Sequence, residues 1–258
     1  MSKGLLSIVM VCYNHASYIR EALGSVISQT YKNWHLIIVD DGSCDDSVAI
    51  INEYIQKYPD KIKLFIHAQG KNLGIIASYA LALQHCNGEF IGFLESDDIW
   101  EANNAEVKIN YLERYPESLV YSCVTPIGDS DAIVKKRAIF TLINSIPHDT
   151  AFNAFWRLLF YNFIPGFSSV FVRSETLASI KFLSEQEYPI WLDWFFWFQI
   201  SRKHKFFCLN QHLVRWRIYK NSYCNTFENT KSKANLIIPK IRFRLRLLKE
   251  IFFRNRSA

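Results

Sequence analysis

The sequence WHLIIVDDGS, residues 34–43, indicates how this chain folds. Residues 34–39 are almost all apolar, as expected of a strand buried on both faces of a parallel sheet. Two carboxylates, Asp40 and Asp41, end this strand. Asp-Gly is a common turn dipeptide, so one interpretation is a simple turn. The other is that a carboxylate at the carboxyl end of a strand accepts a hydrogen bond from a base N–H or a ribose hydroxyl.

Similar apolar segments lie on both sides of this one and alternate with helical patterns. The predicted strands are residues 5–12, 34–39, 62–66 and 90–94. Three helices are predicted between these strands. The first is capped by Ser17 and has apolar positions at Ile19, Leu23, Val26 and Ile27. The second has apolar positions at Val48, Ile51 and Ile55, and the third covers residues 74–85. This strand–helix alternation predicts a mostly parallel sheet covered by helices on both faces. Such sheets bind ligands at the carboxyl ends of their strands.

The second half of the chain is less regular. It predicts an aromatic amphipathic helix over 151–163, a short strand over 168–172, a helix over 194–202 and a short strand over 214–218. No internal repeat and no linker before residue 222 is visible. We therefore expect a single domain over residues 1–225, with a regular half (1–100) and a less regular half (101–225), followed by a tail over 226–258.

A second acidic group, Glu95-Ser96-Asp97-Asp98, follows the fourth predicted strand. Three acids within four residues repel one another unless a cation or a hydrogen-bond donor neutralises them. A hard divalent cation prefers carboxylate and phosphate oxygens, and it would bridge the two phosphates of a nucleotide. The alternative is that Asp97 or Asp98 caps a helix that begins near Ile99.

A third acid, Asp193, is isolated in the apolar run WLDWFFWF, residues 191–198. Burial there raises the proton affinity of a carboxyl group, which suits a general base. The alternative is that Asp193 caps the following helix.

Composition excludes several classes of protein. The chain has 258 residues, half of them hydrophobic and 21% charged, which is a globular composition. Its six cysteines form no CxxC pair, which argues against a zinc knuckle or a redox motif and is typical of a reducing cytosol. There is no apolar stretch of the roughly 18 residues that a membrane span needs, no secretory signal, no Gly-x-Gly-x-x-Gly, no P-loop and no hydrolase triad.

The basic charge is concentrated at the C-terminus. Residues 231–258 hold nine Lys or Arg and one acid, Glu250, so the first 230 residues carry a net charge of −2. From residue 235 onward the pattern predicts a basic amphipathic helix whose apolar stripe is Ile237, Ile241, Leu245, Leu248 and Phe252. Such a helix over 235–256 binds an anionic membrane surface. The alternatives are packing on the rest of the protein and nucleic-acid binding, which no recognition motif supports.

Several of these segments resemble, in order, the motifs of the family 2 glycosyltransferases. The matching segments are SIVMVCYN at 7–14, SQTY at 28–31, VDDGS at 39–43, NLG at 72–74, GEFI at 88–91 and ESDDIW at 95–100. The resemblance covers residues 5 to 225. It implies an α/β fold of the GT-A type that binds a nucleotide-diphosphate sugar, with UDP as the nucleotide, and sugar transfer with inversion. Residues 1–100 would then be the nucleotide-sugar-binding half of the domain and residues 101–225 the acceptor-side half.

The resemblance also implies roles for individual residues. Asp193 would be the catalytic base, in a stretch of the Glu-Asp-Trp-x-x-Trp type. Glu95 and Asp97 would bind Mn²⁺ or Mg²⁺. Trp191, Trp194 and Trp197 are candidate sugar platforms for the acceptor. The expected nucleotide-binding residues are Val11, Tyr13, Asn14, Asp40, Asp41, Lys71, Asn72, Ser96 and Arg217.

The chain departs from the family pattern at three of these places. Glu95 stands where the family commonly has Asp, Leu192 where an acid often precedes the base, and Tyr219 where a His is usual. We expect a metal-dependent inverting enzyme that elongates a bacterial surface glycan, such as a polysaccharide or lipopolysaccharide, at the cytoplasmic face of the membrane. The alternatives are a nucleotidyltransferase, which lacks its Gly-rich basic loop here, and a non-catalytic module that binds sugar nucleotides or membranes.

Overall fold

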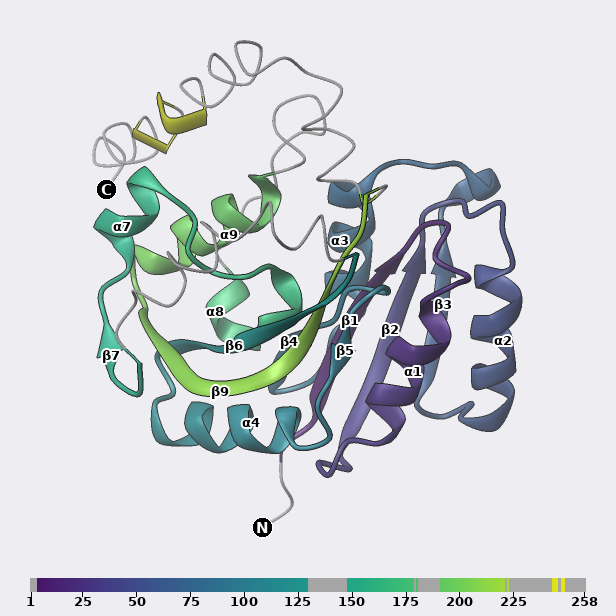
Figure 1. The fold of residues 1–258 in the computed structure, drawn as a ribbon, viewed down its shortest axis with the longest axis horizontal. Coiled ribbons are helices and arrows are strands. Elements are labelled where there is room, and N and C mark those ends of the chain that lie inside the picture. The colour runs from purple at the N-terminus through teal and green to yellow at the C-terminus, as the bar shows by residue number, and fades with distance from the viewer. Residues whose placement is uncertain are drawn as a thin grey trace.

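The strands of this chain form one curled sheet. The computed structural model describes residues 4–129, 148–178, 180, 191–220, 222, 243–245 and 247–248. The strand order is β3-β2-β1-β4-β8-β6-β9-β5, and β7 pairs with β9 (Figure 1). The strands are β1 Leu6–Cys12, β2 Trp34–Asp40, β3 Ile62–Ile66, β4 Phe90–Phe93, β5 Ile99–Trp100, β6 Ser118–Gly128, β7 Ala151–Phe152, β8 Val170–Arg173 and β9 Lys205–Ile218.

Helices cover both faces of the sheet. One set packs on the face that buries Val9 and Val39, and the other on the face that buries Ile8 and Ile38. The α-helices are α1 Ile19–Ile27, α2 Ser47–Lys57, α3 Ile75–Gln84, α4 Asn104–Arg114, α7 Phe155–Phe160, α8 Ser174–Leu177 and α9 Leu192–Ser201, with short 3-10 helices η1 Ala68–Gly70 and η2 Phe167–Ser169. Helices α1, α2 and α4 share one face, and α3, α7 and α9 share the other.

The first half of the sheet is parallel, as the sequence predicts. Strand β1 pairs in parallel with both β2 and β4, and β2 pairs in parallel with β3. All seven residues of β1 are buried. Because successive side chains point to opposite faces, a strand buried on both faces has no polar alternation, and this is why its sequence is a continuous apolar run.

The second half of the sheet is mixed. Strand β8 is antiparallel to both β4 and β6, whereas β6 and β9 are parallel. The long strand β9 curls around this half and pairs with β7 at one end and β5 at the other (Figure 1). The strand expected at 214–218 is therefore only the last part of a much longer one.

Three local predictions are wrong. Ser17 does not cap α1, since Tyr18 precedes the helix and makes no side-chain cap. The helix expected over 151–163 is shorter, because residues 151–152 pair with β9 instead. Asp97 and Asp98 do not cap a helix, because the next residues form β5 and pair with β9.

Most of the tail predicted to be a helix lies outside the described residues, as does the boundary at 225. The described residues 243–245 and 247–248 are helical. Phe243 and Leu247 are fully buried, whereas Leu245 is 51% exposed. The Phe243 ring packs 5.1 Å from those of Trp191 and Trp194. In this part of the tail the predicted stripe is therefore wrong at Leu245, because the ring of Phe243 fills the space beside α9, whereas Leu248 of the stripe does pack against the core. Among the described helices, none is long and apolar enough to cross a membrane.

Candidate active site

The loops that follow β1 and β2 are joined at the carboxyl edge of the parallel strands. Asn14 adopts a left-handed conformation (φ 53°), which Asn tolerates better than most residues. Its backbone N–H donates to Ser43 Oγ at 2.8 Å, and its side-chain oxygen accepts from the Cys44 N–H at 2.8 Å. The Asp41 N–H donates to the Cys12 carbonyl at 2.9 Å. Sequence segments thirty residues apart are thus held together where a ligand is expected.

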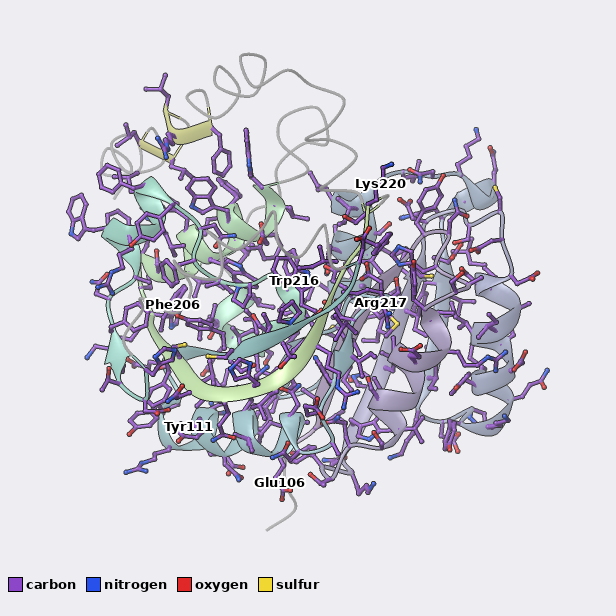
Figure 2. The ribbon with its side chains drawn as sticks, viewed as in Figure 1. Glu106, Tyr111, Phe206, Trp216, Arg217 and Lys220 are labelled. Atoms are coloured by element: carbon purple, nitrogen blue, oxygen red, sulfur yellow. The ribbon has the colours of Figure 1, made fainter. Side chains whose placement is uncertain are left out.

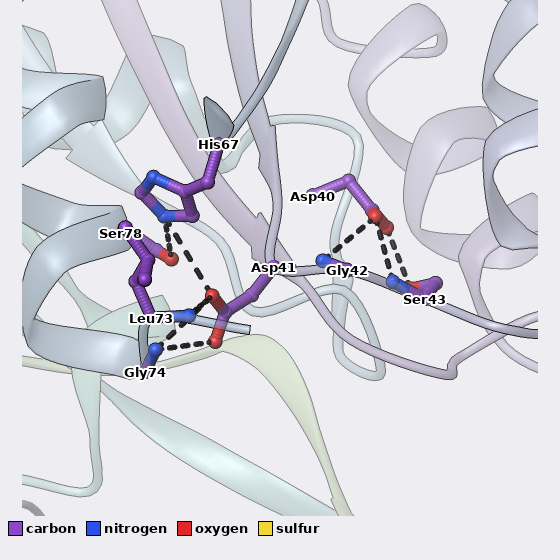
Figure 3. Close-up of polar contacts among 8 residues, drawn as sticks. All are labelled: Asp40, Asp41, Gly42, Ser43, His67, Leu73, Gly74 and Ser78. Atoms are coloured by element: carbon purple, nitrogen blue, oxygen red, sulfur yellow. Dashed lines mark hydrogen bonds and ion pairs between the residues drawn. The ribbon is translucent and has the colours of Figure 1, made fainter. Parts of the chain in front are cut away.

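Asp40 holds its own turn. It is almost fully buried, and one carboxylate oxygen accepts from the backbone of Gly42 and Ser43 at 3.1 and 2.8 Å. The other accepts from the Ser43 hydroxyl at 2.6 Å. The turn interpretation therefore describes Asp40 well, and both of its oxygens have intramolecular donors (Figure 3).

Asp41 ties the second strand to the start of α3. Its Oδ1 accepts from the Leu73 N–H at 2.8 Å, and its Oδ2 accepts from the Gly74 N–H at 3.0 Å. His67 Nε2 lies 3.6 Å from Asp41 Oδ1 and 2.8 Å from Ser78 Oγ (Figure 3). The carboxylate is buried, so a nucleobase would have to share these oxygens with the backbone of α3's first turn.

The loop over residues 70–72 packs directly on Gly42. Gly42 has φ +82°, and a Cβ there would lie 2.8 Å from the Gly70 carbonyl oxygen and 2.9 Å from the Asn72 nitrogen. Lys71 and Asn72 are exposed, so their side chains are free to contact a ligand above this edge.

The first strand ends in the same region. Val11 is buried within β1, so only its backbone is offered to a ligand. Tyr13 is 45% exposed, which suits a ring that stacks on a base.

Glu95 lies in a poorly hydrated position at the end of β4. Its Oε1 accepts a hydrogen bond from the Tyr79 hydroxyl at 2.5 Å. Burial raises the pKa of Glu95 to about 8, and the negative charges of Asp97 and Asp193 raise it further. Burial and the carboxylates of Glu95, Asp193 and Asp98 also raise the pKa of Tyr79. The structure thus brings Glu95, Asp97 and Asp193 within electrostatic reach of one another.

Asp97 is connected to the loop after β1 by a short chain of hydrogen bonds. Its Oδ2 lies 3.3 Å from the Tyr219 hydroxyl, which lies 3.1 Å from His15 Nε2. His15 Nδ1 lies 2.6 Å from Ser96 Oγ, and Ser96 is fully buried. Burial raises the pKa of Asp97. Tyr219, at the position where a His is usual in the family pattern, therefore contacts the acidic motif directly.

Asp98 serves the fold. Its two oxygens accept from Ser168 Oγ at 2.6 Å and from the Arg217 backbone N–H at 2.8 Å. Ser168 also accepts from the Glu95 N–H at 3.0 Å. Asp98 therefore joins β4, η2 and β9, and it leaves Glu95 and Asp97 as the carboxylates of this motif with an oxygen not committed to the fold.

Arg217 lies at the junction between the parallel and the curled halves, whereas Phe206 lies on the far arm of β9 (Figure 2). Its guanidinium donates to the Asp97 carbonyl at 2.8 Å and to Glu21 at 2.7 Å. It also stacks over the Tyr18 ring at 4.8 Å. In this structure the side chain holds the acidic motif, so a contact with a diphosphate requires it to leave Glu21.

Asp193 lies in the first turn of α9. One oxygen accepts from the Asn162 side-chain amide at 2.9 Å, and the other accepts from the Trp194 backbone N–H at 2.6 Å. Burial raises the pKa of Asp193 to about 6, partly opposed by these two hydrogen bonds. A carboxylate with this pKa is ionised at neutral pH and still basic enough to accept a proton.

The expected role of Trp194 as an acceptor platform is wrong. Its ring is 3% exposed, and its indole N–H donates to the Leu158 carbonyl at 2.6 Å. Trp197 is fully buried as well. The reason is that α9 is buried on nearly all sides, so its tryptophans form core. Trp191 is half-buried against Phe243, and its role stays a prediction.

Sequence reasoning missed four residues of this site: His15, Tyr18, Tyr79 and Asn162. His15 follows the matched segment at 7–14 directly, so its position was a usable signal. Tyr79 and Asn162 lie in a helix and a loop without any motif, and only the tertiary contacts identify them.

The donor set of the site suits a hard divalent cation. Glu95 and Asp97 supply carboxylate oxygens. Burial raises the pKa of both, and repulsion from Asp97 and Asp193 raises that of Glu95 further. A cation relieves that repulsion and restores the ionised forms. Asp98 does not fit this role, because both of its oxygens are used within the fold.

Comparisons with known proteins identify relatives of this chain. The family model described as Glycosyl transferase family 2 matches residues 7–175. An uncharacterized glycosyltransferase of Haemophilus influenzae is 27% identical over 239 residues, 89% of this chain and 70% of the relative. The UDP-Glc:alpha-D-GlcNAc-diphosphoundecaprenol beta-1,3-glucosyltransferase WfgD of Escherichia coli is 34% identical over 135 residues, 52% of this chain and 51% of the relative.

A solved structure confirms the predicted fold. The mannosyltransferase PcManGT from Pyrobaculum calidifontis, in complex with GDP-Man and Mn²⁺, superposes with a TM-score of 0.64 at 16% identity. The match covers 86% of this chain and 59% of that one. This chain thus has the α/β fold of the GT-A type, and it spans about half of WfgD and three-fifths of PcManGT.

Proposed function

This chain belongs to glycosyl transferase family 2, and from that premise we propose that it is an inverting enzyme that uses a nucleotide-diphosphate sugar. The acceptor is a hydroxyl of a lipid-linked or surface glycan. The observation that carries this proposal is that the negative charges of Asp97 and Asp193 both raise the pKa of Glu95, although Asp193 lies nearly a hundred residues further along the chain.

Asp193 is the general base of the proposed reaction. It takes the proton of the acceptor hydroxyl as that oxygen attacks the anomeric carbon, and the bond from that carbon to the diphosphate breaks on the opposite side. Attack from the side opposite the leaving group inverts the anomeric configuration. Asn162 and the Trp194 N–H fix the carboxylate orientation, so the base is in place before the acceptor binds.

Glu95 and Asp97 are the proposed ligands of a divalent cation. When bound, Mn²⁺ or Mg²⁺ supplies positive charge that stabilises the departing nucleotide diphosphate. The chain's own contribution is to hold these two carboxylates. Tyr79 fixes Glu95, and Tyr219 and Arg217 fix Asp97 and its backbone.

The nucleotide binds, in this proposal, over the loops that follow β1, β2 and β3. Tyr13 stacks on the base, and Asp41 accepts a base N–H beside the backbone donors it already has. Lys71 and Asn72 face the ribose or the phosphates. We propose UDP as the nucleotide, because WfgD, by its name, uses UDP-Glc.

The proposed acceptor is linked to a membrane lipid, and the protein binds the cytoplasmic face of that membrane. The name of WfgD specifies a diphosphoundecaprenol acceptor. Three exposed apolar side chains support membrane contact: Trp156 at 66%, Phe160 at 59% and Leu245 at 51% exposure. The Arg244 guanidinium donates to the Phe160 carbonyl at 2.5 Å, so α7 and the described tail lie side by side. The basic residues of 231–258 add attraction to anionic lipids.

A transfer assay tests the proposed reaction. The protein is incubated with Mn²⁺, a panel of UDP- and GDP-linked sugars, and a lipid-diphosphate-linked sugar as acceptor, and nucleotide release and product are measured. We expect one donor to give a glycosylated product whose new anomeric centre is inverted by NMR. Retention of configuration, or nucleotide binding without any turnover or hydrolysis, would contradict the proposal.

Vesicle co-sedimentation tests the membrane contact separately. We expect binding to anionic vesicles, little binding to neutral ones, and a loss of binding in a Trp156→Ser, Phe160→Ser variant. Leu73→Ser is the matched control, because Leu73 is 44% exposed but lies on the nucleotide edge. Equal sedimentation of both variants would refute a role for α7.

A further inference from the structure

A second group of reactive side chains lies in the curled half of the sheet. It consists of Cys123 on β6, Cys208 on β9 and His148, which precedes β7. Their ligand atoms all lie within 4.8 Å of one another. Cys208 is on the arm of β9 that carries Phe206, and Arg217 is on the other arm (Figure 2). No residue of this group takes part in the proposed sugar transfer.

The spacing of these atoms suits a shared metal ion. Zinc binds thiolate sulfur at about 2.3 Å and imidazole nitrogen at about 2.0–2.1 Å, so two such ligands at a tetrahedral angle lie about 3.6 Å apart. The distance from Cys123 Sγ to His148 Nε2 is 3.5 Å. An S–H···N contact alone gives a similar distance, and the third ligand, Cys208, is what distinguishes a metal site from a simple pair.

Backbone contacts hold the three ligands in place. Tyr121 is the register partner of Cys208, and the ladder between β6 and β9 shifts register at Cys123. A register shift re-aims a side chain, here that of Cys123. The backbone N–H of Asp149 donates to the Cys208 carbonyl at 2.7 Å, which holds the neighbouring His148 against β9. The group is therefore assembled by three separate segments of the chain.

The surroundings of the two sulfurs favour a cation between them. Cys208 is fully buried and Cys123 is 4% exposed, whereas His148 is half-buried and gives access from solvent. The Cys208 thiol and His148 lower the pKa of Cys123 to about 6, whereas its hydrogen bond with Cys123 and burial raise the pKa of Cys208, so one thiolate of the pair forms readily and a bound cation would have to displace the proton of the other. Among the described residues, the buried Tyr121 hydroxyl has no hydrogen-bond partner besides the Cys208 sulfur, with which it interacts as the outer-shell donors of metal-bound thiolates do.

We propose that Cys123, His148 and Cys208 bind one zinc ion, with solvent in the fourth position. Sulfur and imidazole ligands select zinc, whereas the carboxylates at Glu95 and Asp97 suit Mn²⁺ or Mg²⁺. The ion joins His148 to strands β6 and β9, and so holds in place the segment of chain that leads into β7 and α7. The CxxC spacing that usually signals such a site is absent because the ligands come from distant segments.

Metal titration of the full chain tests this site without any measurement of sugar transfer. The reduced, metal-free protein is titrated with Co²⁺ and then with Zn²⁺. We expect a sulfur-to-cobalt charge-transfer band that saturates at one Co²⁺ per chain at this site, and displacement of that band by one equivalent of Zn²⁺. At a hundredfold excess of free zinc over its Kd, the Tm should rise by about 5 °C or more.

Variants show whether the three side chains are the ligands. His148→Ala changes a half-buried residue, and it should keep the fold by circular dichroism while lowering zinc affinity at least about 100-fold. Cys123→Ser should abolish the charge-transfer band. The control Cys44→Ser removes an exposed thiol and should bind like the unmodified chain. Asp97→Asn should also leave the cobalt band unchanged, since that residue belongs to the other site.

Three results would overturn the proposal. The first is the absence of a sulfur-to-cobalt band in the unmodified chain. The second is an unchanged zinc affinity in His148→Ala. The third is a Cys123–Cys208 disulfide in protein purified under reducing conditions, which would leave no thiolates for the metal.

Discussion

Replacement of Asn162 by Ala should shift the pH dependence of sugar transfer. Asn162 donates to Asp193 Oδ2 at 2.9 Å, and this bond stabilises the ionised carboxylate. A hydrogen bond to a charged group contributes roughly 1.5–3 kcal/mol, and one pKa unit corresponds to about 1.4 kcal/mol. Because Asp193 is only half-buried, water replaces part of the lost bond, so we take the lower end of that range. The pKa of Asp193 should then rise from about 6 by about one unit.

The sign of the effect follows from the role of a base. Asp193 acts when deprotonated, so kcat/KM falls as pH drops below its pKa. In Asn162→Ala this acid limb should move from about pH 6 to about pH 7. The loss of kcat/KM should be about fivefold at pH 6 and should nearly vanish by pH 8. The profile is measured at saturating divalent cation, so that Glu95 stays ionised throughout.

A matched control separates this effect from a general structural one. The Asn153 side chain caps the Phe155 N–H at 2.9 Å, much as Asn162 caps the Ile164 N–H at 3.2 Å. Asn153→Ala loses the same kind of local bond but does not touch Asp193, so its acid limb should stay where it is. An acid limb that is identical in the Asn162 variant and the unmodified chain would refute the assignment of Asp193 as the titrating base.

Further predictions concern the metal, the nucleotide edge and stability. EDTA should suppress transfer, and Mn²⁺ should restore it. More Mn²⁺ should be needed as pH falls, because protons compete with the cation for Glu95, whose pKa is about 8 without the cation. Full activity in chelator would exclude Glu95 and Asp97 as metal ligands. Gly42→Ala should lower the Tm and weaken UDP binding measured by calorimetry, because the added Cβ meets the backbone of residues 70–72. Gly70→Ala, also at positive φ but with open space around the Cβ, should keep UDP affinity. Equal losses of affinity in both variants would contradict the role of this packing. Burial lowers the pKa of Lys108, so its cost to stability is full below the folded-state pKa, shrinks as pH rises above it, and disappears at about pH 10, near the unfolded-state value. Lys108→Met should therefore raise the Tm by about 4 °C or more at pH 7, and the gain in urea unfolding should shrink with increasing pH; a gain that does not depend on pH would contradict this account.

The parallel half of the fold was predictable because each of its strands is buried on both faces. A continuous apolar run such as residues 6–12 can be identified as a buried strand without knowing which elements pack against it. Helix α4 was not predicted, since its inner face carries the buried polar residues Asn104 and Lys108, which break the apolar periodicity. Strand β6 was missed for a similar reason, because Ser118 and Ser122 lie buried within it.

The acids of the site were predictable from sequence, but their partners were not. Asp193, Glu95 and Asp97 stand out as acids next to apolar segments. Tyr79 and Asn162 contact them only through the packing of α3 and of the loop after α7. Trp194 shows the opposite error: an aromatic residue beside a catalytic candidate suggests a platform, and tertiary packing places it in the core.

The central claim is tested most directly by the kcat of Asp193→Asn at pH 7.5, together with its affinity for UDP in the presence of Mn²⁺. Loss of a general base costs about 100- to 10,000-fold in rate, so we predict a kcat lower by at least about 100-fold and a UDP affinity within about twofold of the unmodified chain. A variant that still turns over at the unmodified rate would contradict the account.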